Sequence, residues 1–244
     1  GEPVRVLEVE DEHAEARFVA AEIAGLVEEG FGGSEIAVFY RTNAQSRVLE
    51  DVLVRQGVAY QVIGGPRFYE RAEVKDLVAY LQVIDNPYDA VSLLRIANKP
   101  RRGVGDTTLA RLQTYADTHG ISLWESLEHA EEAGVGGASL RAVTRLRDLL
   151  LSLQSGALEL DLPELVERTL ERSGYLEWLE AERTIEAQGR IENLQELVGV
   201  AREYQETAEE PSLSSFLQEV SLYSDQDAIR GETLLVTLMT IHNA

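Results

Sequence analysis

The sequence predicts a small α/β fold joined to a large all-α region, and three observations support that prediction. Short apolar runs alternate with helical patterns from Val4 to Gly65. Almost everything between Phe68 and Gly231 has helical periodicity. A final β-branched run, Leu234 to Met239, again has the composition of a strand. The simplest architecture is a parallel sheet that is interrupted by a helical insertion and completed by the last strand.

The first region is expected to alternate strands with helices. Its predicted strands are Val4–Val9, Ile36–Tyr40 (as a buried strand) and Val58–Ile63. Its predicted helices are 11–30, with an inward stripe of Phe18, Ile23, Leu26 and Val27, and 45–56, with Val48, Leu49, Val52 and Leu53 inward and Gly57 after its end. Strands that are separated by helices pair in parallel.

The helical region divides at glycines, prolines and polar clusters. We expect its helices at 73–84, 91–97, 106–119, 123–130, 140–153, 162–173, 191–205 and 213–222. The stretch Gly134–Ser139 is expected to be a loop. The acidic runs 125–132 and 203–210 are typical of solvated helix faces or loops.

Composition excludes several functional classes. The net charge of −21 repels phosphates at long range, so any DNA contact needs a local basic patch; otherwise the acidity serves only solubility. The absence of cysteine excludes disulfides, thiolate zinc sites and cysteine nucleophiles, and it fits the cytoplasmic location that we expect. No apolar run approaches the roughly 18 residues that a membrane span needs, so we expect no membrane partner.

Other enzymatic chemistry has no sequence support. The chain has no Gly-x-x-x-x-Gly-Lys-Ser/Thr phosphate loop, so nucleotide hydrolysis is not expected from this chain alone. Its four histidines lie singly, without the spacing of metal ligands. We therefore predict no catalytic, cofactor-binding or metal-binding residue within the chain.

Polar side chains follow two of the predicted strands. Arg41 and Asn43 come directly after the run that ends at Tyr40, and Thr240 and His242 follow the final run. Open α/β sheets bind ligands at the carboxyl ends of their strands. We therefore expect one surface for an anionic polymer, built from both ends of the chain.

A second candidate site is the basic turn, which we define as residues 99–108. From Arg95 to Arg111 the chain has five basic residues and one acidic residue. Gly103 and Gly105 permit a tight turn, and amides at a helix start attract phosphate. Asp106 is expected to be the N-cap of the following helix. The residues predicted to bind phosphate are Arg101, Arg102, Gly103, Gly105, Thr107 and Thr108. A tight turn without a ligand is the alternative.

Several segments resemble the UvrD/PcrA/Rep-type superfamily 1 DNA helicases. Residues 40–47 (YRTNAQSR) resemble motif IV, and residues 64–76 resemble the segment that follows it. Residues 101–105 (RRGVG) resemble the Gly-Ile-Gly turn that binds duplex DNA, with Val104 in place of isoleucine. Residues 190–197 resemble a further segment, and 240–244 (TIHNA) resemble the start of motif V. These segments occur in the family's order along almost the whole chain.

The resemblance implies a fragment of a larger enzyme. Residues 1–68 and 231–244 would be part of the RecA-like parallel sheet of subdomain 2A, and residues 69–230 would be the helical insertion, subdomain 2B. Arg41, Asn43 and His242 would hold single-stranded DNA, and Lys75, the glycine turn and Thr108 would hold the duplex. The 1A and 1B subdomains would bring the phosphate loop, ATP and Mg²⁺. We expect the parent to be an ATP-dependent helicase of DNA repair or replication, and the fragment to be inactive.

Two other functional classes remain open at this stage. The chain could be a stand-alone DNA-binding module that uses only the glycine turn, like a helix-hairpin-helix protein. It could also be a regulatory domain whose acidic helices bind repair or transcription proteins. The latter role is compatible with helicase parentage.

Overall fold

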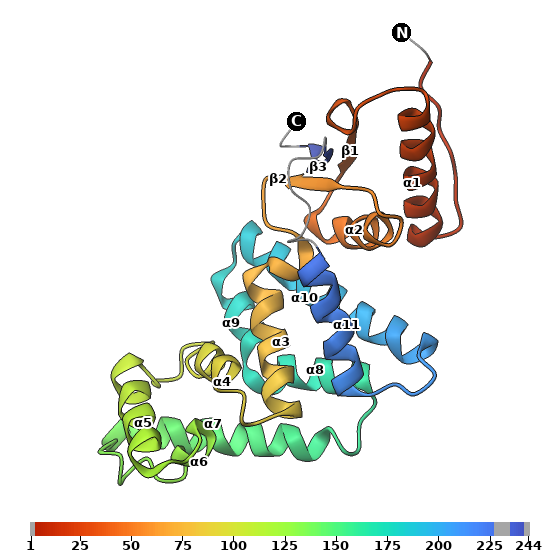
Figure 1. Ribbon diagram of the computed structural model, residues 1–244. Helices are drawn as coiled ribbons and strands as arrows, with labels where there is room; N and C mark the ends of the chain where they lie inside the picture. The colour runs from red at the N-terminus through yellow and green to blue at the C-terminus, as the bar shows by residue number, and fades with distance from the viewer. Residues whose placement is uncertain (1–2, 227–234, 242–244) are drawn as a thin grey trace. The chain divides into compact units, whose positions relative to one another are not determined.

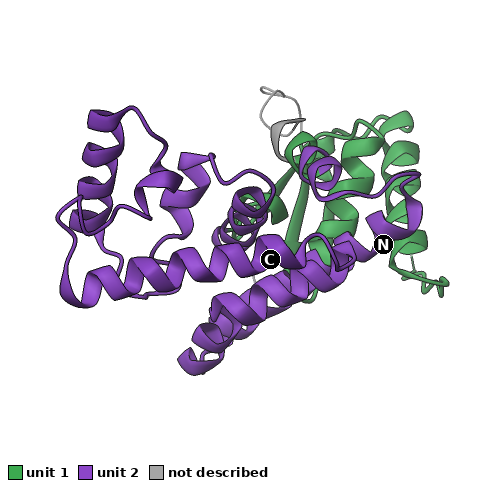
Figure 2. Ribbon diagram, turned by 90° about the horizontal axis from the view of Figure 1, so that it is seen from below, with its two compact units in different colours: residues 1–71, 220–244 green, residues 72–219 purple. Residues whose placement is uncertain are grey.

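The computed structural model describes residues 3–226 and 235–241 (Figure 1). The chain forms two compact units, which are residues 1–71 with 220–244, and residues 72–219 (Figure 2). The sequence predicts divisions after residues 68 and 230, and the subdomain names attached to them stay a prediction. None of the helices that the structure describes is long and apolar enough to cross a membrane.

The first unit contains a three-stranded parallel sheet. Strands β1 (Ala37–Tyr40), β2 (Tyr60–Ile63) and β3 (Val236–Thr240) lie in the order β1-β3-β2. Tyr40 is in register with Thr240, and Ile63 with Met239. The predicted strands at 36–40, 58–63 and 234–239 correspond to β1, β2 and β3, and their parallel pairing is confirmed; Leu234 lies outside the described residues. The prediction of a buried β1 is wrong, because Phe39 on this edge strand is 51% exposed.

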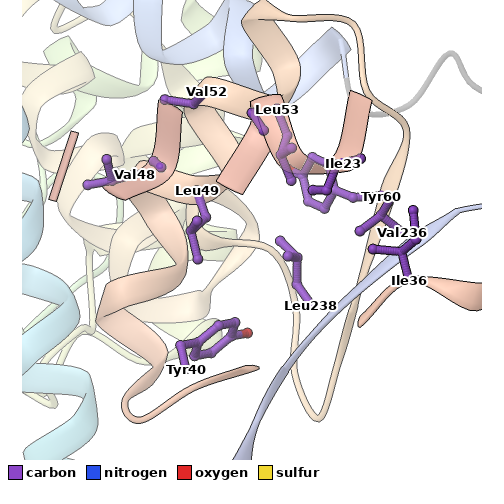
Figure 3. Close-up of a cluster of buried hydrophobic side chains, with 12 residues drawn as sticks. Ile23, Ile36, Tyr40, Val48, Leu49, Val52, Leu53, Tyr60, Val236 and Leu238 are labelled. Carbon is purple, nitrogen blue, oxygen red and sulfur yellow. The ribbon is translucent and has the colours of Figure 1, made fainter. Parts of the chain in front are cut away.

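Helices α1 (Glu12–Glu28) and α2 (Ser46–Arg55) pack together in this unit. Short 3-10 turns occur at η1 (Gly33–Glu35), η2 (Asn43–Gln45) and η3 (Phe68–Glu70). The apolar faces of helices α1 and α2 pack against the sheet in one cluster that includes Ile23, Leu53 and Leu238 (Figure 3).

The predicted apolar stripe of α1 is partly wrong. Phe18 and Val27 are exposed, whereas Ala16, Ala20 and Ile23 are buried. Alanines at a spacing of four residues let two helix backbones approach closely, so the buried face is the one with small side chains. The predicted face of α2 is confirmed.

The predicted strand at Val4–Val9 is absent. These residues have no regular secondary structure and are exposed, with Val4 and Val6 both 91% accessible. A strand needs a hydrogen-bonding neighbour, and no strand in the described part of the chain pairs with this segment. The alternating apolar pattern of residues 4–9 therefore does not form a strand.

The second unit is helical, and its elements are listed in chain order: α3 (Ala72–Asp85), α4 (Ala90–Ile96), α5 (Asp106–His119), α6 (Leu123–Ser126), α7 (Gly137–Gly156), α8 (Leu162–Ser173), α9 (Tyr175–Glu182), α10 (Ile185–Thr207) and α11 (Leu213–Gln226), which runs on into the first unit. Helix α9 was not predicted, α10 begins earlier than expected, and α7 begins inside the expected loop. Helix α3 packs against α4, α7, α8 and α10. Its Leu77, Tyr80 and Leu81 are almost fully buried, so α3 anchors the segment that carries the basic turn.

Candidate nucleic-acid interface

The basic turn connects α4 to α5 and has a defined backbone shape. Val104 is fully buried, which fixes the turn to the helical core. Gly103 has a φ of +90°, a conformation that side chains with a Cβ rarely adopt. A Cβ at this position would meet only Ala142 at an ordinary 3.5 Å, so the backbone angle is what requires glycine.

Asn98 holds the turn from inside. Its Oδ1 accepts hydrogen bonds from the backbone amides of Arg102 at 3.0 Å and Gly103 at 3.2 Å. Sequence reasoning missed this residue, although asparagine commonly bonds nearby backbone in turns. The two amides that Asn98 engages are therefore not open to a ligand.

Two basic residues, Arg95 on α4 before the turn and Lys99 at its start, are paired within the protein. The carboxylate of Asp76 on α3 is 1% exposed. It lies 2.7 Å from Arg95 Nε and 3.3 Å from Lys99 Nζ, and it accepts a hydrogen bond from Tyr175 Oη at 2.8 Å. Arg95 and Lys99 thus contribute less free positive charge than the sequence suggests.

Arg102 makes hydrogen bonds within the protein that support the turn. Its guanidinium donates to the carbonyls of Lys99 at 2.7 Å and Pro100 at 3.3 Å, and also to the hydroxyl of Tyr80. Tyr80 in turn donates to the Lys99 carbonyl at 2.5 Å, and burial raises the pKa of Tyr80 to about 12. Five donors in a rigid fork suit arginine to holding several carbonyls at once. Arg102 therefore supports the backbone of the turn, and its contact with DNA stays a prediction.

Arg101 is the residue of the basic turn whose charge faces solvent. It is exposed, and among residues 3–226 and 235–241 its guanidinium has no ion pair or hydrogen bond. Arg111 donates to the Gly134 carbonyl at 2.5 Å. Arg101 is thus the exposed arginine at the turn whose guanidinium is not engaged by any group of residues 3–226 and 235–241.

A pocket of about 550 Å³ opens at the turn. Its lining residues are Asn98, Arg101, Gly103, Gly105, Asp106, Thr107, Thr108 and Ser139. The structure therefore brings five of the predicted duplex-binding residues into one place. Arg102 is absent from the lining, and Lys75 lies elsewhere, on an exposed position of α3.

The helix start at this pocket differs from the prediction. Gly105, and not Asp106, is the N-cap of α5, and no side chain caps the helix. The amides of Thr108 and Leu109 donate to the Gly105 carbonyl at 2.9 and 3.1 Å. Nothing in the described part of the chain accepts from the amides of Asp106 and Thr107. Free first-turn amides carry partial positive charge, which favours an anion.

The polar end of β1 forms a second, separate candidate surface in the first unit. Arg41 and Asn43 are both exposed there, and the amides of Arg41 and Thr42 donate to Gln45 Oε1 at 3.0 Å each. Thr240 lies at the end of β3 in register with Tyr40, but it is only 8% exposed. His242 lies outside the described residues.

A buried arginine fixes the loop behind this strand end. Arg71 donates to the Asn43 carbonyl at 3.1 Å and to Ser46 Oγ at 2.8 Å, and it lies 3.8 Å from the Glu50 carboxylate. Burial raises the pKa of Glu50, while Ser46 and Arg71 oppose that rise. This network fixes the backbone of Asn43 and leaves its side chain exposed.

Comparison with known proteins identifies the family. A sequence model of the UvrD-like helicase C-terminal domain matches residues 1–135, which is more than half of the chain. The chain belongs to the UvrD-like helicase C-terminal domain family. The resemblance to UvrD/PcrA-type helicases is thereby confirmed.

Individual relatives of this UvrD-like chain are named as helicases. The ATP-dependent DNA helicase UvrD1 of Mycobacterium tuberculosis H37Rv is 45% identical over 257 residues, covering 96% of this chain and 33% of the relative. The ATP-dependent DNA helicase PcrA is 38% identical in Bacillus subtilis strain 168, with 96% of this chain and 33% of the relative covered. In Staphylococcus aureus strain NCTC 8325, PcrA is 39% identical, with 100% and 34% covered. The chain spans about a third of the length of these curated relatives.

The matched part of this UvrD-like chain, residues 1–135, includes the polar end of β1 and the basic turn. It contains Arg41, Asn43 and the whole basic turn, and it ends before Ser139. The small parallel sheet is consistent with a helicase C-terminal, RecA-like portion.

Proposed function

We propose that this chain is the part of an ATP-dependent DNA helicase that holds the DNA backbone. The pocket of the basic turn binds duplex DNA, and the polar end of β1 binds single-stranded DNA. In this assignment residues 1–71 with 220–244 belong to subdomain 2A, and residues 72–219 form the 2B insertion. ATP and Mg²⁺ bind parts of the enzyme that this chain lacks, since the chain has no phosphate loop, and the chain alone does not hydrolyse ATP.

The observation that carries the proposal is the combination of Arg101 with free amides. Arg101, the α5 start and the Thr107 hydroxyl all line one pocket. Arginine and backbone amides neutralise and position phosphates without reading base sequence. A helicase must move along any sequence, so contacts of this kind suit the activity that the relatives' names state.

The test compares two exposed arginines in the 244-residue chain. Arg101→Ala removes the solvent-facing charge of the pocket, whereas Arg168→Ala removes an exposed charge on α8 away from the pocket. Both changes lower the net charge equally. We expect Arg101→Ala to weaken duplex binding roughly tenfold, or about 1.4 kcal/mol, and to reduce the salt slope by about 0.9.

Fluorescence anisotropy with a labelled blunt duplex at low salt measures both quantities. Low salt is needed because a chain of net charge −21 meets long-range repulsion from DNA. We expect Arg168→Ala to leave affinity within about twofold of the unaltered chain. Equal affinities and equal salt slopes for the two variants would remove the basis for duplex binding at the turn.

The β1 end needs its own test. Arg41→Ala in the full helicase is expected to weaken binding of an oligo(dT) strand, because Arg41 is exposed at the carboxyl edge of the sheet. The binding is measured without nucleotide and then with a non-hydrolysable ATP analogue. A loss of analogue affinity with unchanged oligo(dT) affinity would assign Arg41 to the nucleotide phosphates and remove it from the DNA surface.

A further inference from the structure

We propose that the outer face of α5 is a docking site for a basic amphipathic helix of a partner protein, and that one large apolar side chain of this helix sits in a groove between α5 and residues 132–133. The groove has a volume of about 410 Å³. It lies beside the pocket of the basic turn, and Thr107 lines both. Such a site goes beyond DNA binding and gives a place and a chemistry to the protein-interaction class that the sequence leaves open.

The groove lies on the solvent-facing side of α5, where this helix packs against α6 (Figure 1). The small side chains that α5 contributes to it are Thr107, Ala110, Thr114 and Thr118, and all four are exposed. They recur every three or four residues, so they share one face of the helix. Leu112 lies on another face and is fully buried. Small side chains let a second helix approach α5 closely along this exposed face.

The polar groups in the wall of the groove are already bonded within the protein. The hydroxyls of Thr114 and Thr118 donate to the carbonyls four residues earlier, at 2.8 and 2.7 Å. The hydroxyl of Tyr115 donates to the Glu132 carboxylate at 2.6 Å. A polar group of a ligand would therefore lose its bonds to water here without gaining equivalent ones, which costs free energy. An apolar side chain suits this wall better than a polar ligand does.

A stack of aromatic rings holds the wall in place. The ring of Tyr115 stacks on that of His119, with centroids 4.0 Å apart, and on that of His129 at 5.8 Å. His119 Nδ1 donates to the Tyr115 carbonyl at 2.9 Å, since a carbonyl can only accept. His129 Nδ1 lies 3.3 Å from the Glu132 carboxylate. The groove is thus formed before any partner arrives, which reduces the entropy cost of binding.

The charges around the groove favour a cationic partner. From residue 112 to residue 140 the chain contains no lysine or arginine, and its five carboxylates are Asp117, Glu125, Glu128, Glu131 and Glu132. Arg147 pairs with Glu128 at 3.1 Å, whereas the other four have no lysine or arginine partner within residues 3–226 and 235–241. Glu132 lines the groove, and Asp117 and Glu131 directly adjoin lining residues in the chain.

The remaining charges at the groove do not reverse this preference. Arg111 is the cation of the lining, and its Nη1 donates to the Gly134 carbonyl at 2.5 Å. Helix α5 ends at His119, so the negative end of its dipole lies at the groove and attracts positive charge. Complementary charge selects partners and repels unsuitable ones, and here it disfavours a nucleic acid. The partner that fits carries lysine or arginine beside one leucine or aromatic anchor, as in helix-in-groove recognition.

The test selects ligands from a displayed library of helical peptides of about 18 residues, with the 244-residue chain as the target. We expect the enriched sequences to combine one large apolar residue with lysine or arginine on the same helix face. Replacing the apolar anchor of a selected peptide by alanine should weaken its binding about tenfold. Replacing its basic residues by glutamate should abolish binding, because the groove is bordered by carboxylates.

Two matched variants of the chain locate the binding site. Thr114→Arg fills the groove and adds a positive charge to it, whereas Thr144→Arg makes the same change on α7, outside the groove lining. Both threonines are exposed, and both donate to the carbonyl four residues earlier, at 2.8 and 3.0 Å. Arginine has a higher helix propensity than threonine, so neither variant should lose thermal stability. We expect Thr114→Arg to bind the selected peptide about tenfold more weakly, and Thr144→Arg to stay within about twofold of the unaltered chain.

Amide NMR shifts separate a peptide from the other occupants. The selected peptide should shift the amides of Thr114, Thr118 and Ala133, and a blunt DNA duplex at the same concentration should leave them in place. Equal shifts with the duplex would make the groove part of the DNA surface and overturn the inference. A dimer in sedimentation velocity that Thr114→Arg abolishes would make a second copy of this chain the occupant, which also overturns it.

The selection itself can refute the docking site. No enrichment, enrichment of acidic peptides, or equal affinity of Thr114→Arg and Thr144→Arg for the selected peptide would each show that the groove does not receive a basic helix. Basic peptides with an apolar anchor, bound by Thr144→Arg and lost by Thr114→Arg, support it. Duplex binding by the basic turn stands or falls separately, through Arg101→Ala.

Discussion

Replacing Asp76 by asparagine should weaken DNA binding even though it makes the chain less acidic. The Asp76 carboxylate is 1% exposed and holds Arg95 at 2.7 Å and Lys99 at 3.3 Å, beneath the basic turn. Asparagine keeps the shape and can still accept from Tyr175, but it loses both ion pairs. The variant therefore separates the positioning of the turn from the net charge of the chain.

The expected loss of folding stability in Asp76→Asn depends on how exposed Arg95 and Lys99 are. A hydrogen bond to a charged group contributes roughly 1.5–3 kcal/mol; Lys99 makes such a bond to Asp76, whereas Arg95 Nε lies at ion-pair distance without one. The side chains of Arg95 and Lys99 are 35% and 47% exposed, so water replaces part of each interaction. We expect a loss of about 1 kcal/mol for each pair, or about 2 kcal/mol in total. For a unit of this size the apparent Tm should fall by about 4–8 °C.

The binding assay decides whether Asp76 positions the turn. Re-ordering a loosened turn on binding costs on the order of 1 kcal/mol, which is about a fivefold loss of affinity. Asp148→Asn is the control, because it makes the same charge change at an exposed position of α7. It should bind duplex as well as the unaltered chain or slightly better. The reasoning is refuted if Asp76→Asn lowers the Tm yet binds as Asp148→Asn does.

Three further predictions concern single side chains. Arg102→Ala should lower stability by about 2 kcal/mol, measured by urea unfolding, because it removes bonds to the Lys99 and Pro100 carbonyls and to Tyr80; a variant as stable as Arg101→Ala would contradict this. Asp106→Asn should tighten duplex binding about twofold in anisotropy while lowering stability by about 0.5 kcal/mol, since it removes a carboxylate from both the pocket and a helix start; weaker binding would show that this carboxylate does not oppose DNA. Burial raises the pKa of Asp51 to about 7, well above the usual value of about 3.9 for an aspartate, so the unfolded state loses this proton first as pH rises. The contribution of Asp51 to stability should therefore decrease from about pH 4 to pH 7 and then level off, and urea titrations of Asp51→Asn should show a shallower slope, with the remainder due to Glu50; an unchanged slope would exclude Asp51 as a source.

The sequence predicts well those features that depend on local pattern. The strands at 36–40, 58–63 and 234–239 and the helix at 106–119 were found from apolar periodicity, glycines and polar ends. The basic turn was found from its composition, and five of its predicted residues share one pocket. These signals lie within a few residues of each other, where pattern reasoning is reliable.

Features that depend on distant partners were missed. Asp76 lies about twenty residues before the cations that it pairs, and nothing local marks it as their partner. Ser139 reaches the pocket only because α7 begins beside α5. The segment Val4–Val9 alternates as a strand does, yet β structure requires a neighbour that a local pattern cannot supply.

The hydrogen bonds of Arg71 have a mechanical consequence. Arg71 is the last residue before the chain enters the second unit, and its guanidinium grips both the Asn43 carbonyl and Ser46. A pull on the chain at this residue would therefore reach the loop of Asn43 directly through a side chain, and not by deforming the strands. The point at which the chain leaves the first unit and the loop that carries Asn43 are thus linked directly by one side chain.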